Sequence, residues 1–575
     1  MPDESSALLS NAHESSTYGA SQVVPQNEHS AAEQPLDGHE QNGNRDDGAL
    51  EANLKPMPAM APIIIPMAIG IFLAAMDGTI VVSSYAAIGS ELKQLQNTSW
   101  IATGYMLTLT SFQPLYGKLS DIFGRKACLL FAYSVFALGC LFCGLARNMT
   151  ELICARAFAG IGGGGMTTIV SIIMSDIVPL RSRGTWQGRI REKYMSKSAY
   201  HNIKGVLNIV FATGSATGAP LGGFLADSIG WRWAFLIQAP IAMLAILAVS
   251  FALKLPEAQA SNFTARLRRV DFPGAFSLVL CVFFLLFGLD HGGNVSWSDR
   301  WTVGTLAGFV IFGIIFAAIE LEYAREPFAP KRIIVNRSLI ASYLVNFFGL
   351  ASGLSMLFHV SLYLQAVKRK SASEAGLWLL WSIVGSLSGS LGGGLIMQAT
   401  GKFYYVTLAA YLALLFGSGL ILLMTGIITH SLVAVAIGLV VGSLGNGSGI
   451  TTTLIALIAN AGPEDQAIAT AVSYLFRSLG SVVGLSVGST LVQDTLKSSL
   501  RSKLEGRDID DLIRRVRESL DYVDQLDPQT QLVVRAAYED AVHVTLGFTA
   551  IMAAAAVVSA IFIVEKPLPP RSSGR

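Results

Sequence analysis

Three charged side chains lie deep inside long apolar stretches of this 575-residue chain: Asp77, Arg156 and Arg477. An ionisable group near the centre of a bilayer costs at least about 2.5–3.5 kcal/mol on insertion scales, so each one needs a partner or a function. Burial disfavours a charged carboxylate, so Asp77 could hold a proton in one state and release it in another; a structural hydrogen bond is the alternative. Each arginine could receive the carboxylate of a solute or complete a buried ion pair. His359 could titrate, although a lone membrane histidine is more often a helix contact.

The composition of the chain points to a lipid bilayer as its surroundings. Of its residues, 52% are hydrophobic and 14% are charged, whereas soluble domains carry about 25% charged residues. The net charge of +2 gives no reason to expect a nucleic-acid partner. The five cysteines lie in apolar stretches without metal-ligand spacing, so we expect neither a disulfide framework nor a metal site. We also expect no cofactor and no enzyme activity.

Fourteen segments have the roughly 20 mostly apolar residues that a membrane-crossing helix requires. They centre on residues 60–83, 99–116, 127–146, 151–175, 205–227, 232–253, 272–290, 302–322, 339–365, 375–398, 404–426, 431–457, 467–492 and 542–564. Basic residues favour the loops after even-numbered segments, which predicts that both termini are cytosolic; the run at 368–370 is an exception. The predicted fold class is an all-α polytopic membrane protein.

The segments group into two sets of six with a pair between them. We expect a disordered cytosolic tail at 1–57, a six-helix half at 58–253, a linker and two extra spans at 254–330, a six-helix half at 331–565 with a lumenal loop at 493–540, and a cytosolic tail at 566–575. Apolar residues at helical spacing within 493–540 predict an amphipathic helix that lies on the protein or on the membrane interface.

An internal repeat supports this division. Gly117 and Gly124 are followed by a basic residue, and Gly394 and Gly401 repeat that spacing in the corresponding loop of the second half. Parallel repeats of this kind place a substrate site between the two halves, near the middle of the membrane.

The loop Gly117-Lys-Leu-Ser-Asp121-Ile-Phe-Gly124-Arg125-Lys126 resembles the signature G-x-x-x-D-x-x-G-R-R/K of the major facilitator superfamily at every fixed position. The resemblance implies a cluster that locks the two halves together in one conformation and releases them in the other. We expect its glycines to let the turn pack against a neighbouring helix, and Asp121 to pair with Arg125 or with a helix dipole.

A second set of residues is similar to the antiporter motif G-x-x-x-G-P-x-x-G-G, with the proline one place late: Gly214, Gly218, Pro220, Gly222 and Gly223. Such glycines permit close helix approach, and the proline permits a bend. The stretch Asp77-Gly-Thr-Ile-Val resembles the D-x-T-I-V signature of fourteen-span drug:proton antiporters. Residues around Arg156 resemble a family motif whose arginine is linked to proton transfer, and residues 60–126 resemble fungal vacuolar basic amino-acid transporters.

The resemblance implies a proton-coupled secondary transporter, a monomer that exchanges protons for basic amino acids and moves them into the vacuole. The alternatives are plasma-membrane efflux of cationic drugs by proton antiport and a non-transporting nutrient receptor. Residues Glu4, Leu8 and Leu9 match the acidic dileucine pattern E-x-x-x-L-L, which implies a sorting adaptor at the tail and a vacuolar address.

The segment 189–205 interrupts the pattern and is rich in basic side chains, with Arg189, Arg191, Lys193, Lys197 and Lys204. Without it, the distance along the chain from Pro179 to Gly214 agrees with the distance from Pro463 to Gly480 to within one position. The segment is therefore either translated intron sequence or a cytosolic elaboration, which its charge would keep out of the lipid.

Overall fold

The computed structural model describes residues 61–177, 197–253, 272–294, 296–323, 333, 336–504 and 509–566. These residues form helices and turns, and the only strand-like pairing among them is an isolated bridge between Thr425 and His430. The tail at 1–57, with Glu4, Leu8 and Leu9, lies outside the described residues, as do residues 567–575.

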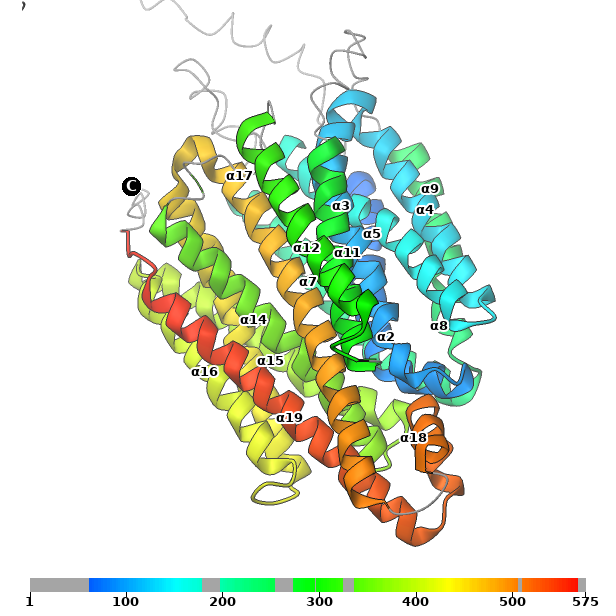
Figure 1. Cartoon of the computed structure of the whole chain (residues 1–575). Coiled ribbons are helices and arrows are strands. Elements are labelled where there is room, and N and C mark those ends of the chain that lie inside the picture. Colours follow the sequence, from blue (N-terminus) through cyan, green and yellow to red (C-terminus); the bar gives the residue numbers. More distant parts are fainter. Residues whose placement is uncertain are drawn as a thin grey trace, which may run out of the picture. The chain divides into compact units, whose positions relative to one another are not determined.

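The helices follow the predicted segments closely (Figure 1). They are α2 (Ala61–Glu91), α3 (Ser99–Phe123), α4 (Arg125–Leu145), α5 (Met149–Ile177), α7 (Lys197–Ser228), α8 (Arg232–Leu236), α9 (Gln238–Ala252), α11 (Phe272–Asn294), α12 (Arg300–Ala318), α14 (Arg337–Leu362), α15 (Ala372–Thr400), α16 (Tyr404–Met424), α17 (Leu432–Lys503), α18 (Ile509–Glu518) and α19 (Pro528–Ile561). Short η1 (Leu95–Asn97), η2 (Ile319–Tyr323), η3 (Tyr363–Val367) and η4 (Val523–Gln525) complete them.

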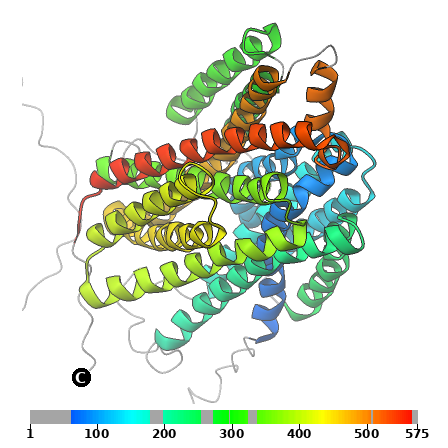
Figure 2. The same ribbon diagram turned by 90° about the horizontal axis from the view of Figure 1, so that it is seen from below.

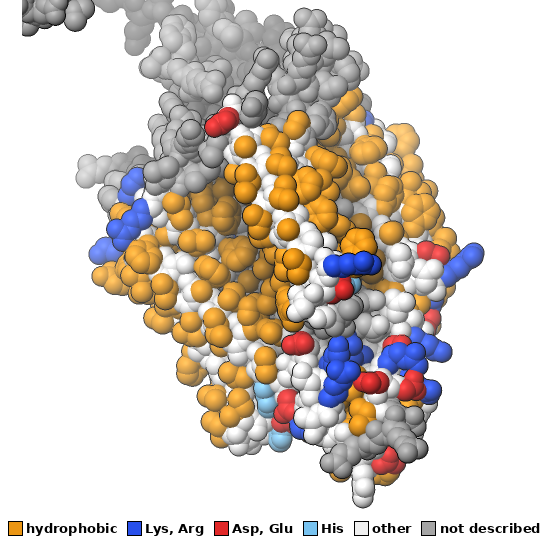
Figure 3. All heavy atoms as spheres, in the orientation of Figure 1, with side chains coloured by type: hydrophobic (Ala, Val, Ile, Leu, Met, Phe, Trp, Pro, Cys, Tyr) orange, Lys and Arg blue, Asp and Glu red, His pale blue; other side chains and the backbone are white. Residues whose placement is uncertain are grey.

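Eleven helices of the described chain are long and apolar enough to cross a membrane. The remaining predicted segments coincide with α3, α7 and α11, and the total of fourteen crossings stays a prediction. Figure 3 shows apolar side chains over the middle of one face, with charged side chains gathered toward the end that carries α18. Large apolar residues such as Phe131, Leu244 and Phe251 are exposed, as expected for a surface in contact with lipid.

Helix α17 contains two of the predicted segments, 431–457 and 467–492. Asn346 donates to Ser473 Oγ at 3.0 Å and accepts from Thr453 Oγ1 at 3.1 Å. These two partners would lie about 30 Å apart on one straight helix, so the chain must reverse direction between them. Leu432–Ala461 and Ile468–Lys503 are each long enough to span a bilayer.

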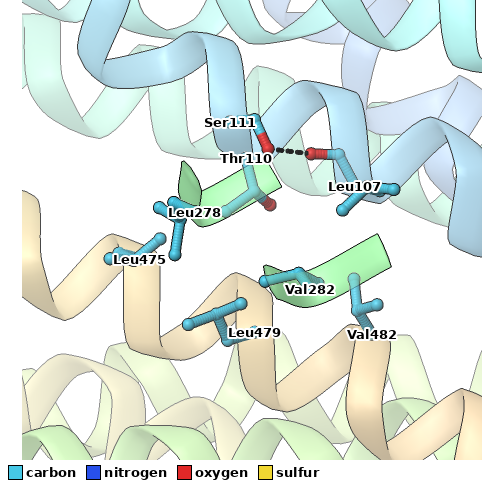
Figure 4. Close-up of a pocket in the computed structure, with 8 residues that line it drawn as sticks. All are labelled: Leu107, Thr110, Ser111, Leu278, Val282, Leu475, Leu479 and Val482. Atoms are coloured by element: carbon cyan, nitrogen blue, oxygen red, sulfur yellow. Dashed lines mark hydrogen bonds between the residues drawn. The ribbon is translucent and has the colours of Figure 1, made fainter. Parts of the chain in front are cut away.

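The helices pack in the two groups that the repeat predicts (Figures 1 and 2). One group contains α2–α5 and α7–α9, and the other contains α14–α17 and α19. Helix α11 pairs with α12 and also contacts α3 and α17. Side chains of α3, α11 and α17 surround a narrow apolar cavity, in which Val282 of α11 faces Leu107 and Val482 (Figure 4). The domain boundaries themselves stay a prediction.

The predicted lumenal loop, 493–540, is largely helical. Helix α17 continues to Lys503, α18 occupies Ile509–Glu518, and α19 begins at Pro528, because polar residues extend both long helices beyond their apolar parts. Ile513 and Val516 of α18 are buried against the other helices. The amphipathic helix is therefore confirmed, and it lies on the protein.

Candidate functional site

The structure joins two of the three predicted charged residues. Arg156 Nη1 of α5 lies 2.7 Å from both carboxylate oxygens of Asp77 on α2, and the two side chains are 1% and 0% exposed. Arg156 Nε also donates to the carbonyl of Ile101 at 3.1 Å. Of the two roles considered for Arg156, the ion-pair role is the one that the structure shows.

Aromatic rings and one amide complete the surroundings of this pair. The Arg156 guanidinium carbon lies 4.2 Å from the ring centre of Tyr105 and 5.4 Å from that of Phe235. Gln238 of α9 donates to Asp77 Oδ1 at 3.2 Å and is fully buried. Sequence reasoning missed Gln238, although a lone amide inside an apolar segment is a signal that could have identified it. A proton on Asp77 would leave Arg156 without its balancing charge, and a role of Asp77 in proton exchange stays a prediction.

Arg477 lies elsewhere, on α17, and does not join the pair. Its guanidinium carbon is 5.2 Å from the ring centre of Tyr474. Whether Arg477 receives a solute carboxylate stays a prediction.

The antiporter-like glycines hold α7 against the helix that carries Asp77. A Cβ built on Gly214, Gly218 or Gly222 would lie less than 3.0 Å from the carbonyl of Phe72, Met76 or Ile80, respectively. These glycines recur every four residues, so they share one face of α7. We call this contact the α2–α7 seam; it confirms close helix approach and fixes the position of Asp77 relative to α7.

Two further members of the motif lie where α7 meets α15. A Cβ on Gly223 would strike the carbonyl of Ala372, and one on Gly376 would strike the carbonyl of Ala219 and approach Pro220. Ala219 occupies the usual proline position, and its carbonyl accepts a hydrogen bond from Ser83. The displaced proline therefore lies in a junction between the two helix groups.

The second group contains the same seam. Gly480, Gly484 and Gly488 of α17 press on Phe347, Ala351 and Ser355 of α14. Each of these glycines lies the same number of positions after its counterpart on α7. Each partner residue on α14 likewise lies a constant number of positions after its counterpart on α2. When α14 is aligned with α2 in this way, Ser352 corresponds to Asp77. We call this contact the α14–α17 seam, and it shows that the predicted repeat exists in three dimensions without a second acidic residue.

The register of the repeat also bears on residues 189–205. In each group, a glycine on the helix before the seam packs on a carbonyl: Gly164 on that of Leu109, and Gly447 on that of Ser386. More residues separate Gly164 from Gly214 than separate Gly447 from Gly480, and the difference equals the length of the segment 189–205. Residues 189–196 lie outside the described chain, and 197–205 belong to α7.

The signature loop forms the turn between α3 and α4. Gly124 has φ +88°, a conformation that favours glycine. Gly117 lies within α3, and a Cβ on it would meet no described atom within 4 Å, so its packing role stays a prediction. Arg125 donates to Ser120, and Lys126 Nζ donates to the carbonyl of Ser250 on α9 at 2.7 Å. Asp121 lies in α3, and its pairing stays a prediction.

Comparison with known families accounts for these features together. The model of the Major Facilitator Superfamily matches residues 67–191 and 199–485. The chain belongs to this superfamily. The match to the superfamily is interrupted at 192–198, inside the segment that exceeds the repeat. Superfamily members are transporters, and this chain is one of them.

Three of the similar relatives are yeast proteins. A vacuolar membrane amino acid uptake transporter of Schizosaccharomyces pombe is 38% identical over 523 residues, which cover 90% of this chain and 87% of the relative. A multidrug resistance protein of the same yeast is 37% identical, covering 84% and 89%. Vacuolar basic amino acid transporter 1 of Saccharomyces cerevisiae is 33% identical, covering 76% and 79%.

Solved structures confirm the major facilitator fold. A bacterial homologue of the human lysosomal transporter Spinster, in an inward-facing and unoccupied conformation, superimposes with a TM-score of 0.57. It is 14% identical, and the alignment covers 88% of this chain and 98% of that structure.

Proposed function

We propose that this transporter is a proton-coupled antiporter that resides in the vacuolar membrane and moves basic amino acids into the vacuole. Two of the relatives are a vacuolar amino acid uptake transporter and a vacuolar basic amino acid transporter, which supports the substrate class and the membrane. We expect it to act as a monomer.

The buried pair Asp77–Arg156 carries the proposal of proton coupling. A proton on Asp77 removes the charge that balances Arg156, and an unbalanced buried charge costs several kcal/mol. The guanidinium must then find another anion or move toward water. Antiport requires the proton and the solute to exclude each other. The cationic side chain of a basic amino acid is attracted only by the charged form of Asp77, so a proton on Asp77 and a bound solute would compete for this carboxylate.

The arrangement of the helix groups supports solute entry from the side opposite α18. Hydrogen bonds join the groups at the α18 end: Tyr85 Oη to Phe358 O at 3.1 Å, Gln365 Nε2 to Ser83 O at 3.2 Å and Ser373 N to Asp227 Oδ2 at 2.7 Å. With a cytosolic N-terminal tail, this closed end faces the lumen. We propose that the structure represents the state that accepts solute from the cytosol.

Uptake into isolated vacuoles tests the proposal. Labelled lysine should accumulate when the lumen is acidic and should stop accumulating when a protonophore collapses the gradient. Lysine accumulation that is indifferent to the gradient would contradict proton coupling, and an absence of lysine transport would contradict the substrate class.

Plasma-membrane efflux of cationic drugs is the second candidate, because a multidrug resistance protein is nearly as similar to this chain as the amino acid transporter. A cationic dye offered in the same vacuole assay distinguishes the two functions. Dye transport without lysine transport would favour efflux, and transport of neither would favour a nutrient receptor.

A further inference from the structure

A buried histidine lies at the closed end of the molecule, in the contact between the two helix groups. His359 of α14 is 4% exposed. Its Nδ1 lies 2.6 Å from the carbonyl oxygen of Ser355. A carbonyl oxygen only accepts hydrogen bonds, so Nδ1 carries the proton of the neutral ring and Nε2 offers a lone pair.

His359 lines a small cavity of about 30 Å³, enough for roughly two water molecules. The wall comes from both groups, with Tyr85 and Thr98 on one side and Gln493 and Tyr538 on the other. Gly488 lets the imidazole fit, because a Cβ there would lie 2.6 Å from His359 Cε1. The α14–α17 seam thus ends at the histidine.

The lining residues of the cavity include no carboxylate. From the elements packed around His359, α2 presents Tyr85 and α19 presents Tyr538 as titratable groups, while η1, α3 and α17 present only uncharged side chains to the cavity. Behind this lining, Arg517 of α18 donates from Nε to Gln493 Oε1 at 2.9 Å, so a cation lies next to the cavity wall. Both tyrosine hydroxyls already donate to backbone carbonyls, those of Phe358 and Val516. An imidazolium would therefore be unbalanced while the cavity is closed, and it would gain hydration if the two groups separated.

We propose that His359 is a second proton-binding site of this transporter, distinct from Asp77, and that its protonation favours separation of the helix groups at the α18 end. By the register of the repeat, His359 corresponds to Ser84 of α2, which lies two helical turns beyond Asp77 toward that end, or about 10 Å along a helix. A proton entering from this end meets His359 first. The inference deepens the proposed function and relies on it only for the identity of the acidic compartment.

A distance measurement on the purified full chain tests the site without solute or gradient. Spin labels on Arg147→Cys and Thr429→Cys would report the separation, because both positions are exposed in loops of different helix groups. The labels are placed in a Cys154→Ser background, since Cys154 is also free and exposed. Lowering the pH from about 7.5 to about 5.5, across the ordinary imidazole range, should raise the ratio of separated to closed ends by about tenfold, the change produced by a one-unit difference in pKa between two states.

The variant His359→Asn retains a donor for Ser355 O and removes Nε2, so it should lose most of this pH response. His359→Gln serves as a second neutral variant in case the first folds poorly. His291→Asn is the matched control, since His291 also has its Nδ1 bonded, to Thr302 Oγ1 at 2.9 Å, but does not line the cavity. An unchanged response in both folded His359 variants, or no response in the parent chain, would overturn the proposal, and neither result depends on which solute is carried.

Discussion

A single nitrogen of Arg156, Nη1, lies 2.7 Å from each oxygen of Asp77. The guanidinium does not use its two-pronged fork for the carboxylate, because Nε is turned to the carbonyl of Ile101. The pair therefore rests on one nitrogen inside a fully buried site, and a proton on either carboxylate oxygen would disturb the whole contact.

Replacing Asp77 by Asn should abolish proton-driven accumulation and also lower the stability of the protein. The amide cannot cycle a proton, and Arg156 is left as an unpaired buried charge, at a cost of about 3–5 kcal/mol. The double variant Asp77→Asn/Arg156→Gln should recover most of the thermal stability but none of the accumulation. Normal gradient-dependent uptake by the single variant would remove Asp77 from the mechanism.

Replacing Gly218 by Ala should destabilise the α2–α7 seam by about 1–3 kcal/mol, because the methyl group has no room against Met76. Gly484→Ala should do the same in the α14–α17 seam. Gly419→Ala of α16 is the control, since a Cβ there meets no described atom within 4 Å. Thermal unfolding of the purified variants measures the effect, and equal melting of all three would contradict the seam.

Replacing Arg125 by Ala should slow transport more than it weakens solute binding. Arg125 donates to Ser120, and Lys126 donates to the carbonyl of Ser250, so both residues hold the turn between α3 and α4 in place. Neither belongs to the Asp77–Arg156 pair, so we expect the turn to govern switching between states. Lys402→Ala, at the corresponding turn of the second half, is the control. The measurement compares the maximal uptake rate with the equilibrium affinity for the solute. A loss of affinity at an unchanged rate would refute this role.

The first turn of α19 should keep its cap in an acidic lumen. Asp527 accepts from the backbone N–H of Thr530 at 3.0 Å, and this bond lowers the pKa of the Asp527 carboxyl. A lowered folded-state pKa gives stability above the unfolded value of about 3.9, which is lost only as the pH falls through the folded value. Protection of the first turn of α19 from hydrogen exchange, corrected for intrinsic rates, should therefore be equal at about pH 7 and about pH 5.

Asp527→Ala should lose that protection at both pH values, whereas Asp527→Asn should retain most of it, because asparagine also caps helices. A fall in protection between the two pH values in the parent chain would show that the cap titrates within the lumenal range.

Deletion of residues 189–205 should preserve or improve expression and transport. The deletion joins Gly188 to Val206 and removes the excess length over the repeat, together with five basic residues at the start of α7 and just before it. Those charges must stay at the membrane interface, and pulling α7 toward it would misplace Gly214 in the seam. Transcripts that routinely encode the segment, combined with a deletion that destroys transport, would show it to be a working part of the protein.

The helices of the fold could be predicted from the sequence because each predicted span is a long apolar run, a signal that lipid imposes locally. The limits of the predicted loop 493–540 could not be predicted, because the ends of helices that extend beyond the bilayer are polar and have the composition of a loop. The reversal inside α17 was visible in the sequence as two apolar segments, although the residues that connect them, 458–466, are themselves helical.

The candidate site was predictable in its charges and not in its contacts. Asp77, Arg156 and Arg477 were equally unusual in sequence, but only the packing of α2 against α5 shows which two of them meet. Gln238 carries no charge, and its role depends on a contact between α9 and α2, which no local pattern encodes. The glycine spacing of α7 predicted a close approach, but not that its partner would be the helix of Asp77.

The Asp77–Arg156 pair also determines how the membrane voltage acts on the transporter. As an ion pair it has no net charge, and a uniform field does no net work when such a site moves. Once Asp77 is protonated, the same site carries the unit charge of Arg156, and full transit of one charge is worth about 2.3 kcal/mol per 100 mV. Of the two solute-free forms of the site, only the proton-loaded one would then respond to voltage, so the membrane potential would act on the step in which this form changes conformation.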